Sequence, residues 1–141
     1  KTICEDYKKV EPSIIKSKSY QICNDKRPYE YFNFDPDLRH EKGNKYLLKT
    51  LSENAPLTKG NGYITIHFTI NCNYEIGRFG LEQMDMNYNA ATFDTALIKH
   101  LMTKISEIKD WNSNTEKNDG YDIHYFLMFK IENGKIIDLC P

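Results

Sequence analysis

The stretch that decides the fold runs from Gly62 to Ile76 and reads GYITIHFTINCNYEI. Its first part alternates two sets of side chains: an apolar set of Ile64, Ile66, Phe68 and Ile70, and a more polar set of Tyr63, Thr65, His67 and Thr69. Such alternation, in β-branched and aromatic residues, is typical of a strand with one buried face. We therefore predict a strand over 62–72 that buries its even-numbered face in the core and leaves its odd-numbered face to water.

A second strand should return from the first as the other arm of a hairpin. Asn73–Tyr74 lies at the tightest point of that hairpin, and Glu75 to Met86 (EIGRFGLEQMDM) forms the returning segment. Gly77 and Gly80 contribute no side chain to this segment, so we expect a bend or a β-bulge near them.

The C-terminal part of the chain predicts another hairpin. Tyr121 to Ile131 (YDIHYFLMFKI) alternates apolar residues, and Asn133–Gly134 follows shortly after it. An Asn-Gly pair between apolar runs is the strongest short-range signal for a two-residue hairpin turn. The chain should therefore fold back as a short fourth strand over 135–139. Counting back from such a turn sets Leu127 opposite Cys140.

Two helices are predicted from the spacing of apolar residues. The first covers Asn44 to Asn54 (NKYLLKTLSEN), with Asn44 as its N-cap and Pro56 beyond its end. The second covers Thr92 to Lys109, with Thr92 as its cap. The apolar face of this second helix consists of Phe93, Ala96, Leu97, Leu101, Ile105 and Ile108.

The order of these elements is helix, strand, strand, helix, strand, strand. This order predicts an α+β fold, in which an antiparallel sheet of three to four strands carries both helices on one face. The strand after the second helix should dock beside the first strand, which gives the strand order 2-1-3-4. Residues 1–43 then form an irregular, aromatic-rich N-terminal extension packed on a core domain of residues 44–141.

Bulk properties restrict the classes of function. The chain has 141 residues, with 19 Lys and Arg, 20 Asp and Glu, and a formal net charge of −1. This length fits one domain with a real core, and the balanced charge does not favour a nucleic-acid partner. No run of apolar residues is long enough to span a membrane.

The cysteines bear on the compartment of the protein. Cys4, Cys23, Cys72 and Cys140 form neither a CxxC motif nor a metal-like spacing with histidine. An even number of scattered cysteines is typical of disulfides in an exported protein. We expect two disulfides, for which three pairings are open. The alternative is four buried free thiols in a cytosolic protein.

The candidates for partner binding lie in two places. In the extension, the aromatic run at 27–34 (RPYEYFNF) contains Tyr29, Tyr31 and Phe32, which form either a lid over the core or a recognition patch. On the odd-numbered face of the sheet the candidates are His67, His124, Phe126 and Met128. If the helices cover the other face alone, the last two are exposed apolar residues, which often mark contact sites. Otherwise the extension or a dimer partner covers them.

No constellation in the sequence predicts catalysis. His67 and His124 fall on strands predicted to be neighbours, and Asp122 would complete a zinc site, but the third ligand lacks a fixed spacing and we interpret both histidines as solvent-facing. Cys72 near His67 suggests a Cys-His nucleophile, for which a disulfide or a buried thiol is the simpler interpretation. No nucleophile elbow, dinucleotide fingerprint or P-loop occurs. The acidic residues interpreted as surface charges are Glu75, Glu82, Asp85 and Asp94. We therefore predict no catalytic, cofactor-binding or metal-binding residue.

The ordered pattern resembles the C-terminal domain family of the TonB energy transducers. In that family a Gly precedes alternating apolar residues that end in Phe-x-Ile. A tight turn, a second strand, a helix, a Trp, a polar loop with Gly and an aromatic-rich last strand follow. The residues that match are Gly62, Ile64, Ile66, Phe68, Ile70, Ile76, Leu97, Leu101, Trp111, Gly120, Tyr121, Ile123 and Tyr125. The match covers about 44–131, and Asn71–Cys72 is similar to the divergent, stand-alone versions typical of Bacteroidetes.

The resemblance implies an exported, non-enzymatic module that binds a protein partner in the periplasm or cell envelope, without a cofactor. A lipid anchor on a removed upstream segment would fit the stand-alone versions. TonB-like domains accept a partner's extended segment along the exposed edge of the last strand. Here the strand predicted after Asn133–Gly134 would cover that edge. The chain also departs from the family pattern at Tyr74, where a Gly is usual, and lacks the Pro-rich surroundings of Trp111.

Two other hypotheses stay open. A small ligand-binding protein or enzyme would place its site in a pocket between the sheet and the extension, near Tyr29, Tyr31 and Phe32. A structural homodimer would use the sheet face or an edge strand.

Overall fold

The structure is a computed structural model that describes residues 13–15, 29–30, 42–71, 75–109 and 123–140, with side chains for 42–71, 75–109 and 124–140. The helices in this part of the chain are α1 (Gly43–Ser52) and α2 (Thr95–Glu107). The strands are β1 (Ser13–Ile15), β2 (Tyr29–Glu30), β3 (Gly62–Ile70), β4 (Ile76–Met84), β5 (Ile123–Glu132) and β6 (Lys135–Cys140).

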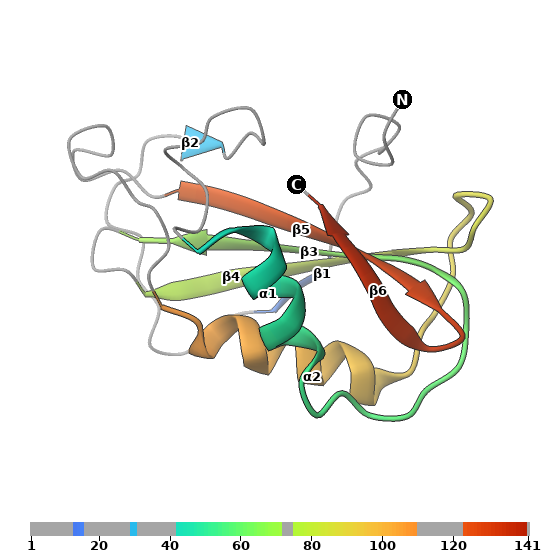
Figure 1. The fold of residues 1–141 in the computed structure, drawn as a ribbon. Helices are drawn as coiled ribbons and strands as arrows, with labels where there is room; N and C mark the ends of the chain where they lie inside the picture. The colour runs from blue at the N-terminus through green and yellow to red at the C-terminus, as the bar shows by residue number, and fades with distance from the viewer. Residues whose placement is uncertain (1–12, 16–28, 31–41, 72–74, 110–122, 141) are drawn as a thin grey trace.

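An antiparallel sheet lies at the centre of the molecule (Figure 1). Its strands run β4-β3-β5-β6, so the predicted α+β fold and the predicted order 2-1-3-4 are confirmed. β3 pairs with β5 from Gly62↔Ile131 to Ile70↔Ile123. Two short strands from the N-terminal region extend the sheet, because β1 pairs antiparallel with β4 and β2 pairs parallel with the start of β5.

Both helices cover the same face of the sheet, as predicted (Figure 1). The even-numbered side chains of β3 form the centre of this core: Ile64, Ile66, Phe68 and Ile70 are each at most 1 % exposed. The ring of Phe68 stacks on Tyr125 of β5 with centroids 5.5 Å apart. The helix residues in the core are Leu47, Leu51, Leu97, Ile98, Leu101 and Ile105. Ala96 was predicted on this face and is exposed instead.

The second face of the sheet is buried as well. Every residue of β3 is buried, and Thr65, His67 and Thr69 are at most 3 % exposed. The prediction that this face is left to water is therefore wrong. Alternation in a sequence separates two faces by their chemistry, but it does not report whether the more polar face meets solvent.

The N-terminus of α2 differs from the prediction because another residue caps it. The Oδ1 of Asp94 accepts a hydrogen bond from the N–H of Ala96 at 2.8 Å, so Asp94 is the N-cap. Thr92 stays outside the helix. The N–H of Phe93 donates to the side-chain oxygen of Gln83 at 2.7 Å, which ties this segment to β4 before the helix can begin.

The N-terminus of α1 also differs from the prediction. The helix begins at Gly43, one residue before the predicted cap Asn44, and its N-cap position is Lys42, without a side-chain capping bond. The Lys42 ammonium instead lies 4.8 Å from the ring centroid of Tyr46. Its attraction to the ring adds to helix packing at this end.

The bulge predicted in the second strand of the hairpin is confirmed at Arg78. Pairing moves from His67↔Gly80 to Thr69↔Gly77, so β4 contains one extra residue between these pairs. Arg78 adopts a φ of 53°, in the left-handed region, where a bulge increases the local twist of a strand.

A second bulge, in β6, corrects the predicted register with β5. Pairing starts after the turn as expected, but the partner of Lys130 is Asp138, one residue further along β6 than regular pairing allows. Cys140 consequently lies opposite Met128 and not opposite Leu127.

The reason for this bulge lies in which side chains face the core. The extra residue, Ile137, is 42 % exposed, and Leu139 turns into the core opposite Phe129, where it is 6 % exposed. Regular pairing would place Asp138 opposite Phe129 and bring a carboxylate into an apolar layer. Burying a leucine is favourable and burying an uncompensated carboxylate is costly. The turn fixes local spacing, but this choice depends on the core.

The turn between β5 and β6 is held by the loop that precedes β3. Asn133 and Gly134 have φ values of 51° and 77°, the pair of left-handed residues that a type I′ turn requires. The N–H of Gly134 donates to the Gly60 carbonyl at 2.8 Å, and the Thr58 hydroxyl donates to the Gly134 carbonyl at 2.9 Å. The N–H of Asn133 donates to Oδ1 of Asn61 at 2.9 Å. The predicted hairpin is confirmed, and this loop anchors it to the sheet.

Replacing Gly134 by alanine should destabilise the protein more than replacing Gly43. Both glycines have positive φ values, 77° and 80°, so both substitutions incur a left-handed penalty of roughly 1–2 kcal/mol. A Cβ at Gly43 meets nothing within 4 Å, whereas a Cβ at Gly134 would overlap the Thr58 carbonyl. Gly134→Ala should therefore also open the anchoring loop and lose about 1 kcal/mol or more in hydrogen bonds. Urea denaturation measures the difference. Equal losses for the two variants would contradict the anchoring role.

Candidate functional site

A row of polar side chains crosses the second face of the sheet on three neighbouring strands. β3 contributes Thr65, His67 and Thr69, β4 contributes Glu82 and β5 contributes His124. In the pairing register, Thr65 lies opposite Glu82 and Thr69 lies opposite His124. His67 lies between these two positions, which makes it a diagonal neighbour of both Glu82 and His124.

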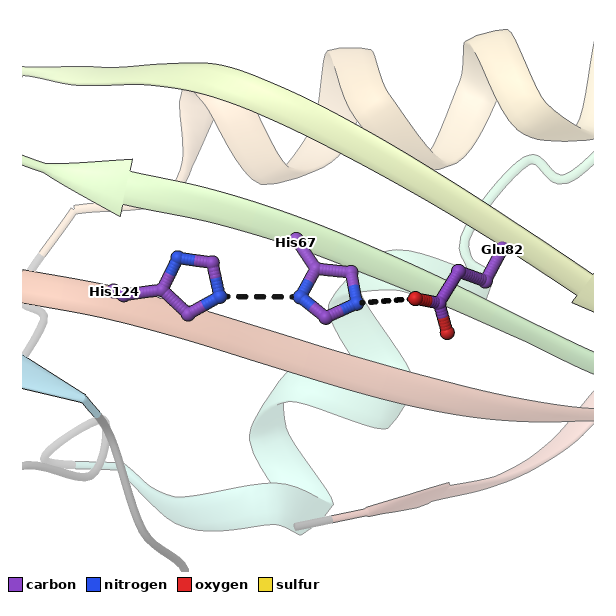
Figure 2. Close-up of polar contacts among 3 residues, drawn as sticks. All are labelled: His67, Glu82 and His124. Atoms are coloured by element: carbon purple, nitrogen blue, oxygen red, sulfur yellow. Dashed lines mark hydrogen bonds and ion pairs between the residues drawn. The ribbon is translucent and has the colours of Figure 1, made fainter. Parts of the chain in front are cut away.

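His67 links the two other ionisable side chains (Figure 2). Its Nε2 lies 3.4 Å from Oε1 of Glu82, and its Nδ1 lies 3.1 Å from Nε2 of His124. The ring centroid of His67 is 5.3 Å from that of His124 and 5.9 Å from that of Phe126. Both ring nitrogens of His67 are therefore engaged, and an aromatic ring packs beside it. We call Glu82, His67 and His124 the histidine relay.

The histidine relay is most deeply buried at its carboxylate end. Glu82 is 4 % exposed and His67 is 3 % exposed, whereas His124 is partly exposed. Neither carboxylate oxygen of Glu82 accepts a hydrogen bond from a described residue. A carboxylate removed from water is costly unless a positive or hydrogen-bonding group faces it. Nε2 of His67 is such a group, so we place a proton on this nitrogen.

One proton, and not two, fits between Nδ1 of His67 and Nε2 of His124. When His67 is neutral, its Nε2–H faces Glu82 and its Nδ1 accepts from the Nε2–H of His124. If the pair takes up a proton, the contact persists as a charge-assisted hydrogen bond beside the carboxylate. If both rings are charged, two N–H groups face each other across 3.1 Å and the contact is lost. The observed contact therefore requires that at least one of the two facing nitrogens lacks a proton.

The predicted proximity of His67 and His124 is confirmed, and the predicted exposure of His67 to solvent is wrong. Asp122, the predicted third ligand of a zinc site, lies outside the described residues. Within the described part of the chain, no group of three or more His, Cys, Asp or Glu side chains could hold a metal ion.

Met128 does not belong to an exposed contact surface. It is 1 % exposed and packs with Tyr63 and Met84, with Cys140 at the margin of this cluster. Phe126 is partly exposed and packs beside the ring of His67. Of the two alternatives left open for this face, exposure does not hold for Met128, which is buried like the odd-numbered residues of β3.

The remaining predicted residues are only partly described. Cys140 is disulfide-bonded. The backbone of Tyr29 belongs to β2, in register with Ile123, and its side chain is not described. The predicted site residues that lie outside the described part of the chain are Cys4, Cys23, Tyr31, Phe32 and Cys72.

Glu82 is the residue that sequence reasoning missed. It was interpreted as a surface charge, but it is buried beside His67. A signal was available, because counting back from a turn at Asn73–Tyr74 places Glu82 opposite Thr65, on the same face as His67. What the sequence could not supply was the burial of that face.

A second candidate surface is an apolar groove between α2 and β4. It encloses a volume of about 370 Å³. Its more buried lining residues are apolar: Leu81, Phe93, Ile98 and Met102. Its polar lining residues are the half-buried Gln83 and the exposed Thr92, Thr95, Lys99 and Thr103. An apolar floor with a polar rim is the anatomy of a protein-contact site. We call this feature the α2–β4 groove.

Comparison with known proteins assigns neither a family nor a function to the chain. No family model, no curated protein and no solved structure matches the chain. Among the described residues, neither helix combines the length and the apolar composition that crossing a membrane requires. We therefore infer function from the geometry of this chain.

Removing the imidazole of His67 should destabilise the protein strongly at neutral pH. His67→Ala removes the imidazole that faces the buried carboxylate of Glu82, and leaving a buried polar group with a partner missing costs about 1–3 kcal/mol, more for a charged group. Adding Glu82→Gln removes the charge and should recover part of the loss in urea denaturation. The control is Thr65→Val on the same strand, because Oγ1 of Thr65 is buried without a described hydrogen-bond partner and its removal should be nearly neutral. If Glu82→Gln recovers nothing, the buried carboxylate is not the source of the loss.

Tyr63 should make the folded state less stable at high pH. Burial raises the pKa of Tyr63 above 10.0, and the charge and hydrogen bond of the neighbouring Tyr88 raise the pKa further. Because the pKa is raised in the folded state, neutral Tyr63 makes its full contribution to stability below pH 10. This contribution is lost as pH rises through the folded-state pKa of Tyr63. Urea denaturation as a function of pH should therefore show a smaller alkaline loss for Tyr63→Phe than for the wild type. Tyr46→Phe, on α1, is the control. An unchanged slope for Tyr63→Phe would contradict the expectation.

Proposed function

We propose that the chain is an exported, non-enzymatic module that binds a protein partner, as the resemblance to TonB C-terminal domains implies. The observation that carries this proposal is the α2–β4 groove. A cleft with apolar walls and a few polar groups at its mouth is the usual form of a binding site. Its lining combines Ile98 and Met102 from α2 with Leu81 from β4, so two rigid elements hold its shape.

Covered strand edges favour the groove over strand addition as the mode of binding. β4 pairs on its outer side with β1 at Phe79–Leu81 and makes a bridge from Met84 to Ala90. β5 pairs with β6 between Met128 and Glu132, and β2 pairs with it at Ile123 and His124. A partner strand needs an unpaired edge, so these edges offer little room for one.

The outer edge of β6 is the remaining place for strand addition in the central four-stranded sheet. No described strand pairs with it there. However, β6 has a bulge at Ile137 and exposes Lys135 and Asp138. Bulges and charges are devices that protect an edge from pairing with other chains. We therefore favour the α2–β4 groove over the edge of β6.

The disulfide at Cys140 supports an extracytoplasmic location, since disulfides persist in oxidising compartments. We place the module in the periplasm or cell envelope, in line with the TonB-like resemblance. A lipid anchor on an upstream segment belongs to the same proposal.

The groove also indicates the chemistry of the partner segment. Apolar side chains of the partner would enter between Ile98 and Met102, and an acidic residue beside them would face Lys99 at the rim. Such a segment would derive most of its affinity from the few anchors in the groove.

Peptide selection against the purified full chain tests this function. Peptides from a random library should include apolar anchors beside acidic residues. Met102→Lys should weaken their binding at least tenfold, which corresponds to about 1.4 kcal/mol, with an unchanged melting temperature as evidence of folding. Ile137→Lys, on the edge of β6, is the matched control and should bind normally. Peptides that respond to Ile137→Lys alone would favour strand addition. Failure to select any saturable peptide would contradict the proposed function.

A further inference from the structure

We propose that the facing nitrogens of His67 and His124 form a binding site for a divalent transition-metal ion of the zinc type. Nδ1 of His67 and Nε2 of His124 are 3.1 Å apart. Two nitrogen ligands of one tetrahedral Zn²⁺, each about 2.0–2.1 Å from the metal, are separated by roughly 3.3–3.4 Å. The rings thus need to separate by a few tenths of an ångström and to turn so that both nitrogen lone pairs point at the ion.

Glu82 occupies the position of an outer carboxylate in such a site. Histidines that bind metals usually donate the N–H of their other ring nitrogen to a carboxylate or carbonyl, which fixes the ring and raises its basicity. Nε2 of His67 lies 3.4 Å from Oε1 of Glu82, so its Nδ1 is left to face His124. The carboxylate, the imidazole and the metal position then follow in the order seen in carboxylate–histidine–zinc triads.

The scaffold holds the two ligands rigidly. His67 lies in β3 and His124 in β5, and these strands are hydrogen-bonded along the whole of β3. The two residues are diagonal neighbours on one face, so neither ring has to cross a strand to reach the ion. This pre-organisation lowers the cost of binding.

Within the part of the chain that the structure describes, two histidine nitrogens are the ligands of the proposed site. The described residues add no third His, Cys, Asp or Glu ligand to the two nitrogens. Water or a donor from a bound molecule would fill the remaining positions, which is the pattern of zinc sites that bind external ligands. His124 is partly exposed, so solvent can reach this end of the histidine relay. We accordingly expect weaker binding than at a closed four-ligand site.

Protons compete with the metal for the same lone pairs. For both nitrogens to ligate, His67 keeps its proton on Nε2, and His124 holds its proton on Nδ1. Affinity should therefore fall as pH is lowered into the range in which histidine takes up a proton. A hydrogen bond between the rings without metal affinity is the competing explanation of the 3.1 Å contact.

Zinc titration of the chelator-treated full chain by calorimetry tests the proposal, with Co²⁺ absorption as an independent readout. One Zn²⁺ per chain should bind at neutral pH and weaken in acid. His124→Gln should abolish this binding, and because His124 is partly exposed the variant should fold, which thermal melting checks. Glu82→Gln should weaken binding about 10–100-fold.

The matched control is His100→Gln on α2, whose Nε2 contacts the Leu51 carbonyl at 2.8 Å, away from the histidine relay. This variant should bind zinc as the wild type does. Absence of saturable binding to the wild type, or equal binding by wild type and His124→Gln, would overturn the metal site and leave the shared hydrogen bond as the explanation. Neither result bears on the α2–β4 groove, so the two proposals fail independently.

Discussion

β3 is paired on both sides and buried on both faces, and this arrangement dictates what its side chains must contact. β3 is hydrogen-bonded to β4 and to β5 and has no exposed residue. On one face this burial is favourable, because apolar side chains pack against α1 and α2. On the other face it removes Thr65, His67 and Thr69 from water. Polar groups there must find partners within the protein.

The histidine relay follows from this constraint. A charged or polar side chain on the buried face is tolerated when a complementary group lies at a neighbouring position. Glu82 and His124 lie at the two diagonal positions around His67, one on each adjacent strand. The same arrangement that satisfies the burial of these groups also leaves two nitrogens facing each other at 3.1 Å. The side chains that compensate for one another's burial on this face are therefore also those of the proposed metal site.

The bulges show how pairing and burial are reconciled elsewhere. At Arg78 the extra residue increases twist in β4, and at Ile137 it turns Leu139 into the core. The second bulge also breaks the regularity of the edge strand β6. β4 and β5 are largely covered on their outer sides, whereas the α2–β4 groove opens beside helix α2 and not along a strand edge. The groove proposed for partner binding and the protected edge of β6 therefore lie in different parts of the molecule.

Local sequence signals specify the two helices, the four central strands, their order and the α+β class, but not the short strands β1 and β2. Alternation over 62–70 and the Asn133–Gly134 pair act through local backbone preferences, which neighbouring residues alone specify. Tertiary contacts account for the burial of the polar face of β3, for the contact of Glu82 with His67, and for Leu139 in place of Asp138 at the core. Burial and register beyond a bulge depend on segments distant along the chain. Periodicity distinguishes two faces of a strand, but it does not specify what lies against either one.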